Sequence, residues 1–118
     1  MSFFGKEIFL PNKQRWTERI REIVSAEDGQ PYGLAEAVII RSAPHRHEET
    51  RETYLLVSGE LDVFLGDDNS TKIRLENPGE TIEIPVGVRH WAESAGEKPA
   101  KVLVTTIPPW RPEDHILC

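Results

Sequence analysis

The chain has almost no cysteine: the only one, Cys118, is the last of its 118 residues. An internal disulfide is therefore excluded, and the fold must rest on packing or on a bound metal ion. A chain of this length can bury a hydrophobic core without covalent cross-links. We therefore expect a single domain and assign no role to the terminal thiol.

Positive charge is also scarce, and it is scattered. Fourteen lysines and arginines face twenty aspartates and glutamates, which gives a formal net charge of −6 at pH 7. No basic stripe runs along any segment of the sequence. This balance argues against nucleic acid and against acidic membrane surfaces as partners.

Long apolar runs are missing as well. No segment approaches the roughly 20 consecutive apolar residues that span a bilayer. Met1 is not followed by the basic segment and long apolar stretch of a secretion signal. We therefore expect a cytoplasmic protein.

What the chain does contain is a series of short apolar runs separated by Gly, Pro, Asn, Asp and Ser, the residues that favour turns. Several runs alternate as half-buried strands do: Ile73 and Leu75 share one face, and the charged residues beside them share the other. Strands are predicted at residues 32–41, 53–58, 60–65, 71–76, 81–85, 88–93 and 101–107. Closely spaced short strands of this kind predict an all-β sandwich or jelly-roll barrel.

Residues 1–30 precede this series and are interpreted as an N-terminal extension, with the barrel at 31–118. One helix is predicted, at residues 13–24, because Trp16, Ile20, Ile23 and Val24 fall on one stripe at helical spacing. We expect that stripe to pack against the core or against a second subunit.

Three histidines and a glutamate form the pattern that indicates chemistry. His45 and His47 are two residues apart, so on an extended backbone both imidazoles point to the same face. Glu52 follows after a short gap, at the start of a predicted strand. His90 lies on a later strand, after a corner at residues 85–87 that reverses the chain.

Three imidazole nitrogens and one carboxylate oxygen suit a divalent transition metal ion: iron, manganese, nickel, copper or zinc. The spacing does not choose among these metals. Taken alone, the two nearby histidines also fit a solvated loop, because they lie between Pro44 and the acidic Glu48 and Glu49.

Two blocks of the sequence resemble the motifs of the cupin superfamily, in particular its small single-domain members of the cupin-2 type. The first block is His45-Arg46-His47, four residues, Glu52, six residues, Gly59. The second is Gly79, five residues, Pro85-Val86-Gly87, two residues, His90. Two positions depart from the pattern: Ile39 replaces the usual first glycine, and Ser94 the usual last asparagine.

This resemblance implies a double-stranded β-helix, or jelly-roll barrel, with a short N-terminal helix or strand extension. It also implies that His45, His47, Glu52 and His90 bind one divalent metal ion inside the barrel. Cupins commonly pair through N-terminal strands, so a homodimer is expected. The apolar residues that would form the contact are Phe3, Phe4, Ile8, Phe9 and Leu10.

Three further residues are candidates for a catalytic or binding role. Tyr54 shares the face of Glu52 along its strand and is expected to point inward, beside the metal. Glu49 is a candidate general base, although it also fits a solvated loop. Arg41 is a candidate for binding an anionic substrate. His115 is expected on the barrel exterior, in a proline-rich tail.

The resemblance leaves several functions open. One is an enzyme acting on a small polar molecule such as a sugar or an organic acid, by isomerase, lyase or dioxygenase chemistry. The alternative is a non-catalytic module that binds a metabolite in the barrel, with a metal whose role is structural.

Overall fold

The computed structural model describes residues 4–9 and 17–118, with side chains from Glu18 onward. Two short 3-10 turns are present, at Ala26–Asp28 and Pro112–Asp114, and this described part contains no α-helix. The strands are β1 (Phe4–Phe9), β2 (Thr17–Val24), β3 (Gly33–Arg41), β4 (His45–Arg46), β5 (Arg51–Ser58), β6 (Leu61–Leu65), β7 (Thr71–Leu75), β8 (Thr81–Ile84), β9 (His90–Ser94), β10 (Ala100–Ile107) and β11 (Ile116–Leu117).

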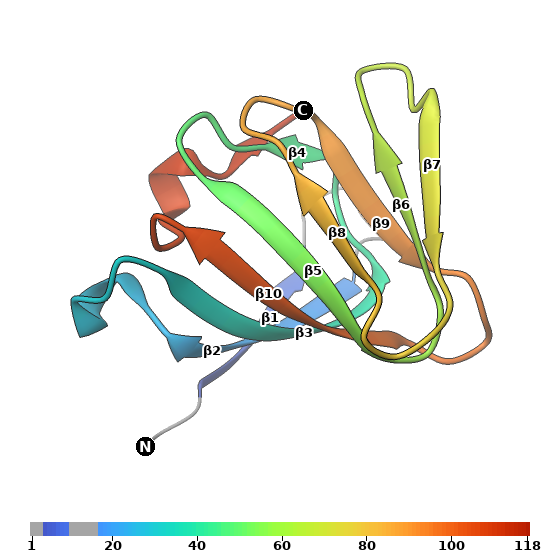
Figure 1. Cartoon of the computed structure of the whole chain (residues 1–118), viewed down its shortest axis with the longest axis horizontal. Helices are drawn as coiled ribbons and strands as arrows, with labels where there is room; N and C mark the ends of the chain where they lie inside the picture. The colour runs from blue at the N-terminus through green and yellow to red at the C-terminus, as the bar shows by residue number, and fades with distance from the viewer. Residues whose placement is uncertain (1–3, 10–16) are drawn as a thin grey trace.

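The strands curl into a nearly closed antiparallel barrel (Figure 1). One side of the barrel has the strand order β1-β2-β3-β10-β5-β8, and the other has β7-β6-β9-β4-β11. The two sides join where Arg41 of β3 pairs with Glu93 of β9. The jelly-roll architecture expected from the sequence is confirmed.

All seven strands predicted from alternation are present, and their ends differ from the prediction by at most two residues. In β5, for example, Glu52, Tyr54 and Leu56 are buried, and Arg51 and Val57 are exposed. Alternate side chains of the strands on both sides of the barrel point inward, where they meet and form one apolar core. Its most buried members are Ala37, Ile39, Leu56, Leu61, Val63, Ala92, Ala100 and Val102.

The helix predicted at residues 13–24 is wrong for the part that the structure describes. Residues 17–24 form strand β2, which pairs along almost the whole of β3. The stripe of Ile20, Ile23 and Val24 also fits a strand, because β-branched side chains favour extended backbone. Pairing with β3 satisfies the backbone hydrogen bonds of β2 and decides between the two. Trp16 lies outside the described residues.

Glycine is required at two corners of the motif region. Gly59 has a φ of 78°, and a Cβ atom there would lie 3.0 Å from the backbone of Ala100. Gly87 has a φ of 84°, and its backbone N–H donates to the carbonyl oxygen of His47 at 2.6 Å. These backbone angles favour glycine, which has no Cβ atom. The Gly87 bond ties the corner before His90 to the segment that carries His45 and His47.

No helix in the described part of the chain is long and apolar enough to cross a membrane. The expected dimer contact falls on Phe3 and Leu10, outside the described residues, and on β1, whose side chains are not described. The homodimer, the cytoplasmic location and the domain boundary at residue 30 therefore stay predictions.

We predict that Leu56→Ala lowers the free energy of unfolding by about 2–5 kcal/mol, because Leu56 is fully buried and its truncation leaves a cavity. Urea denaturation of the two variants measures the difference. The matched control is Val57→Ala, on the next residue of β5, where the side chain is 37% exposed and the expected loss is about 0.5 kcal/mol. Equal losses in the two variants would contradict this description of the core.

Candidate metal centre and its cavity

The four residues singled out as metal ligands meet inside the barrel. His45 lies on β4, His47 just after it, Glu52 on β5 and His90 on β9. Each offers one ligand atom, and these atoms all lie within 4.8 Å of one another. All four side chains are buried, with exposures between 1% and 5%. Pairing of β4 with β9 sets His45 directly opposite His90 and so brings the two motifs together.

Backbone carbonyls fix the orientation of the three imidazoles in the cluster. Nδ1 of His45 donates to the carbonyl oxygen of Ala43 at 2.7 Å, and Nδ1 of His90 donates to that of Val88 at 2.9 Å. Nδ1 of His47 donates to the carbonyl oxygen of Asp114 at 2.7 Å. A carbonyl oxygen only accepts, so each Nδ1 must carry the hydrogen. In the neutral imidazole the lone pair is therefore on Nε2.

All three Nε2 atoms face one carboxylate oxygen, Oε1 of Glu52. The distances are 2.8 Å from His90, 3.0 Å from His47 and 3.9 Å from His45. Lone pairs on nitrogen and oxygen repel at such distances unless a positive charge lies among them. Protons on the imidazoles or a metal ion supply that charge. Nitrogen and oxygen donors, held by outer hydrogen bonds, fit a divalent transition metal.

The pKa values in the metal-free cluster follow from this arrangement. Burial favours the neutral form of Glu52, but hydrogen bonds from His47 and His90 hold its pKa well below the usual value. Burial disfavours charge on His47 too, yet the hydrogen bond to Glu52 raises the pKa of His47. Burial and the adjacent His90 lower the pKa of His45 well below its usual value. These shifts favour a positive charge between His47 and Glu52, where a metal ion would lie.

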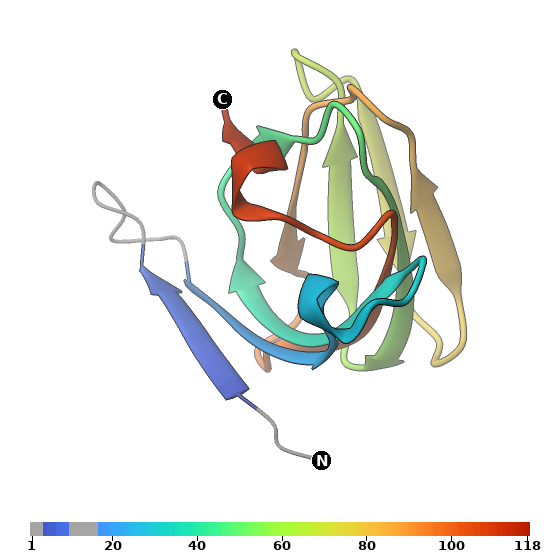
Figure 2. The ribbon, with the colours of Figure 1, turned by 90° about the vertical axis from the view of Figure 1, so that its left-hand side faces the viewer.

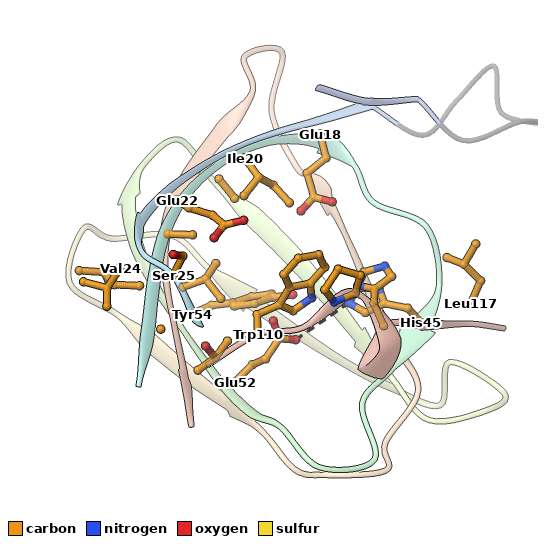
Figure 3. Close-up of a pocket in the computed structure, with 18 residues that line it drawn as sticks. Glu18, Ile20, Glu22, Val24, Ser25, His45, Glu52, Tyr54, Trp110 and Leu117 are labelled. Atoms are coloured by element: carbon orange, nitrogen blue, oxygen red, sulfur yellow. Dashed lines mark ion pairs between the residues drawn. The ribbon is translucent and has the colours of Figure 1, made fainter. Parts of the chain in front are cut away.

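Beside the cluster lies a cavity of about 310 Å³. His45 and Glu52 form part of its wall, so a molecule in the cavity reaches the metal ligands directly (Figure 3). Most of the remaining wall is apolar. Its apolar residues from β2, β3 and β10 are Ile20, Val24, Leu34, Ala35, Ala37 and Val104.

Of the three further candidates, the structure brings only Tyr54 to the cavity. Tyr54 is buried and lines it, and burial together with the charge of Glu52 raises its pKa well above the usual value. Arg41 instead pairs with Glu93 at 3.3 Å and lies over the ring of Trp91, away from the cavity lining. Glu49 has an exposed side chain, and its backbone N–H donates to Asp114.

His115 does not lie on the exterior as expected. Its ring stacks on that of His45, with centroids 4.3 Å apart, and it lines the cavity. Burial and the nearby His47 lower the pKa of His115 to about 4, so it is neutral at pH 7. Figure 2 shows the C-terminal segment that carries His115 lying across one end of the barrel.

The same segment holds the loop between His47 and Glu52. The carboxylate of Asp114 accepts hydrogen bonds from the backbone N–H groups of Glu48 and Glu49 and from the hydroxyl of Thr50. Its own carbonyl oxygen orients His47. A contact between residues more than sixty positions apart leaves no trace in local spacing, so sequence reasoning missed it.

Glu18 was missed for a different reason. It lies on β2, where alternate residues Glu18, Ile20, Glu22 and Val24 all line the cavity. Burial, with the charge of Glu52, raises the pKa of Glu18 to about 7. The sequence could have shown this, because these four residues alternate along the chain and so lie on one face of a strand. The helical interpretation of the segment concealed it.

A family model described as the cupin domain matches residues 40–106, which include all four clustered residues. The chain belongs to the cupin family. The resemblance carried by the two motifs is thereby confirmed.

The individual proteins that match this chain share between 17% and 30% sequence identity with it. An uncharacterized protein of Methanocaldococcus jannaschii, MJ1618, is 30% identical over 80% of this chain and 77% of its own length. A predicted oxalate decarboxylase of Thermotoga maritima matches with a TM-score of 0.75 at 17% identity, over 90% of this chain and 93% of that one. KdgF of a Halomonas species matches with a TM-score of 0.66 at 20% identity, over 90% and 89%. At these identities the two structures show the fold alone.

We predict that metal occupancy of this cupin falls as the pH drops through and below about 6.5, the usual pKa of histidine. The imidazoles must be neutral to bind a metal, and the raised pKa of His47 lets protons compete from a higher pH. Elemental analysis after dialysis across a pH series measures this, with circular dichroism to confirm that the protein stays folded. Full occupancy in folded protein at about pH 4 would contradict the assignment of these ligands.

Proposed function

We propose that this cupin binds one divalent transition metal ion through His45, His47, Glu52 and His90, and that it is an enzyme acting on a small polar molecule held in the adjoining cavity. The observation that carries the proposal is the convergence of three Nε2 lone pairs on Oε1 of Glu52. The donor set suits iron, manganese, nickel, copper or zinc.

The cavity supports a catalytic rather than a purely structural role for the ion. A metal with four protein ligands keeps one or two coordination positions for a further ligand. The cavity is bounded by two of those ligands, His45 and Glu52, so a small molecule can enter on that side. When bound there, the ion would supply Lewis-acid polarisation of an oxygen atom or a site for dioxygen.

The chain itself supplies groups that would orient the substrate. Tyr54 keeps its phenolic proton at neutral pH, because its pKa lies well above the usual value, so it is available as a hydrogen-bond donor. Its ring lies edge-on to that of His90, 6.4 Å between centroids, which sets it next to the metal ligands. Trp110 and His115 cover the cavity from the C-terminal side and would exclude water.

Isomerase, lyase and dioxygenase chemistry are all compatible with such a site. The structural neighbours include a predicted oxalate decarboxylase, which at 17% identity supports only that this fold can carry chemistry on a small molecule. The alternative is a non-catalytic cupin that holds a metabolite. The largely apolar wall favours it, because the ionisable residues that line the described cavity besides the metal ligands His45 and Glu52 are Tyr54, Glu18, Glu22 and His115 alone. Oxygen consumption by the iron-loaded protein separates dioxygenase chemistry from the other options.

Metal content tests the proposal directly. We expect elemental analysis of the untagged protein to find close to one transition metal ion per chain, and the His47→Ala, His90→Ala double variant to have lost it, because two of the four ligands are gone. Isothermal titration of the metal-free proteins gives the affinities.

His115→Ala is the matched control, since His115 stacks on His45 but is not one of the four clustered residues. This variant should keep its metal. Stoichiometric metal in the double variant, or none in the wild type after reconstitution with each of the five metals, would rule the proposal out.

A further inference from the structure

The part of the chain that carries three of the four clustered residues has little regular structure. His45 and Glu52 belong to strands, but His47 lies between them, where the backbone forms no strand. Strand β4 ends at Arg46 and β5 begins at Arg51. A metal site needs its donor atoms held closely in place, so another part of the molecule must fix this loop.

One side chain from the far end of the sequence binds three consecutive residues of the loop. Asp114 is 8% exposed. Its Oδ1 accepts a hydrogen bond from the backbone N–H of Glu48 at 2.8 Å. Its Oδ2 accepts from the backbone N–H of Glu49 at 3.1 Å and from the hydroxyl of Thr50 at 2.7 Å. Backbone N–H groups outside a strand need an acceptor, and a carboxylate is a strong one. These bonds hold residues 48–50 in one conformation.

The main chain of Asp114 binds the residue just before this loop. Its carbonyl oxygen accepts from Nδ1 of His47 at 2.7 Å. The other two imidazoles use carbonyls two positions before them in the chain, those of Ala43 and Val88. Local chain geometry therefore orients His45 and His90, whereas the orientation of His47 depends on where residue 114 lies. The carboxylate bonds to the loop determine that position.

The chain around Asp114 contacts the ligand-bearing segment again. Strand β11 pairs with β4, which sets Leu117 opposite His45, and the backbone N–H of Cys118 donates to the carbonyl oxygen of Pro44. Residues 114–118 thus run along the whole segment that leads from Pro44 to the loop before Glu52. None of residues 107–118 lies in the part of the chain that the cupin model matches.

We propose that Asp114 is a positioning residue of the metal centre. Its carboxylate fixes the loop between His47 and Glu52, and its carbonyl oxygen thereby directs the Nε2 lone pair of His47 toward the ion. This inference rests on the proposed metal site, of which Asp114 is not a ligand. Hydrogen-bond partners behind a metal ligand typically change metal affinity by about 10- to 100-fold. A residue outside the cupin motifs thus helps to set the affinity of the site.

Replacing the carboxylate tests the proposal. In Asp114→Ala the two N–H groups and the hydroxyl lose their acceptor, and we expect the zinc affinity to fall about tenfold or more. Asp114→Asn keeps an oxygen that can accept from the N–H groups, so its zinc affinity should stay within about threefold of the wild type. The affinities are measured at pH 7 by competition with a zinc chelator.

Two controls separate positioning from a loss of stability. Glu113→Ala changes the exposed neighbour of Asp114 and should alter the zinc affinity by less than about twofold. Leu56→Ala weakens the fold through the core and leaves the loop bonds intact. It should therefore keep its zinc affinity, provided that circular dichroism shows both it and Asp114→Ala to be folded at the assay temperature.

NMR of the metal-free protein distinguishes a failure of this proposal from a failure of the metal site. The hydrogen on Nδ1 of His47 bonds to the carbonyl oxygen of Asp114 and should be protected from exchange with water. Asp114→Ala should lose this protection, whereas the Nδ1 hydrogen of His90, which bonds to Val88, should keep it in both proteins. This result does not require zinc.

A wild type that binds no zinc would defeat the proposed metal function, and the exchange of the His47 hydrogen would then decide the role of Asp114. Unchanged protection of that hydrogen in Asp114→Ala would overturn the positioning proposal. So would a zinc affinity of Asp114→Ala equal to that of Leu56→Ala, or an Asp114→Asn variant that binds zinc no better than Asp114→Ala.

Discussion

A single carboxylate, that of Glu52, organises the centre of this molecule. Three imidazole nitrogens converge on one of its oxygens in a buried space, and neutral imidazoles of this tautomer would present lone pairs to a negative charge. Such an arrangement is stable only around a cation. Folding the barrel therefore creates a need for positive charge at its centre, and a divalent metal ion bound by the four side chains would supply it.

The rest of the fold keeps these donors in place. The pairing of β4 with β9 sets His45 against His90, and the Gly87 corner bonds to the backbone of His47. Three backbone carbonyls hold the outer ring nitrogens, which leaves little freedom of rotation to the imidazoles. One of these carbonyls belongs to Asp114, so the C-terminal segment is a structural part of the metal centre as well as a cover for the cavity.

The sequence predicted what depends on local patterns. Period-two alternation placed the strands, and the resemblance to the cupin motifs singled out His45, His47, Glu52 and His90, which the structure brings together. The alternation along β5 correctly predicted that Tyr54 points inward.

The errors arose where tertiary contacts decide the structure. The β-branched residues of 17–24 fit a helical stripe and a strand equally well, and only pairing with β3 separates the two. Because that segment was taken for a helix, the inward row of Glu18 and Glu22 was not seen. The inward fold of His115 depends on Asp114 bonding to a loop far away in the chain.

The measurement that tests the central claim most directly is nitrogen-15 NMR of the histidine side chains in the zinc-loaded protein. Long-range nitrogen–proton correlations report which ring nitrogen carries the hydrogen and which is bound to the metal. The account predicts that His45, His47 and His90 all carry hydrogen on Nδ1 and bind zinc through Nε2, while His115 shows no metal-bound nitrogen. Hydrogen on Nε2 of any of the three, with zinc present at one ion per chain, would contradict it.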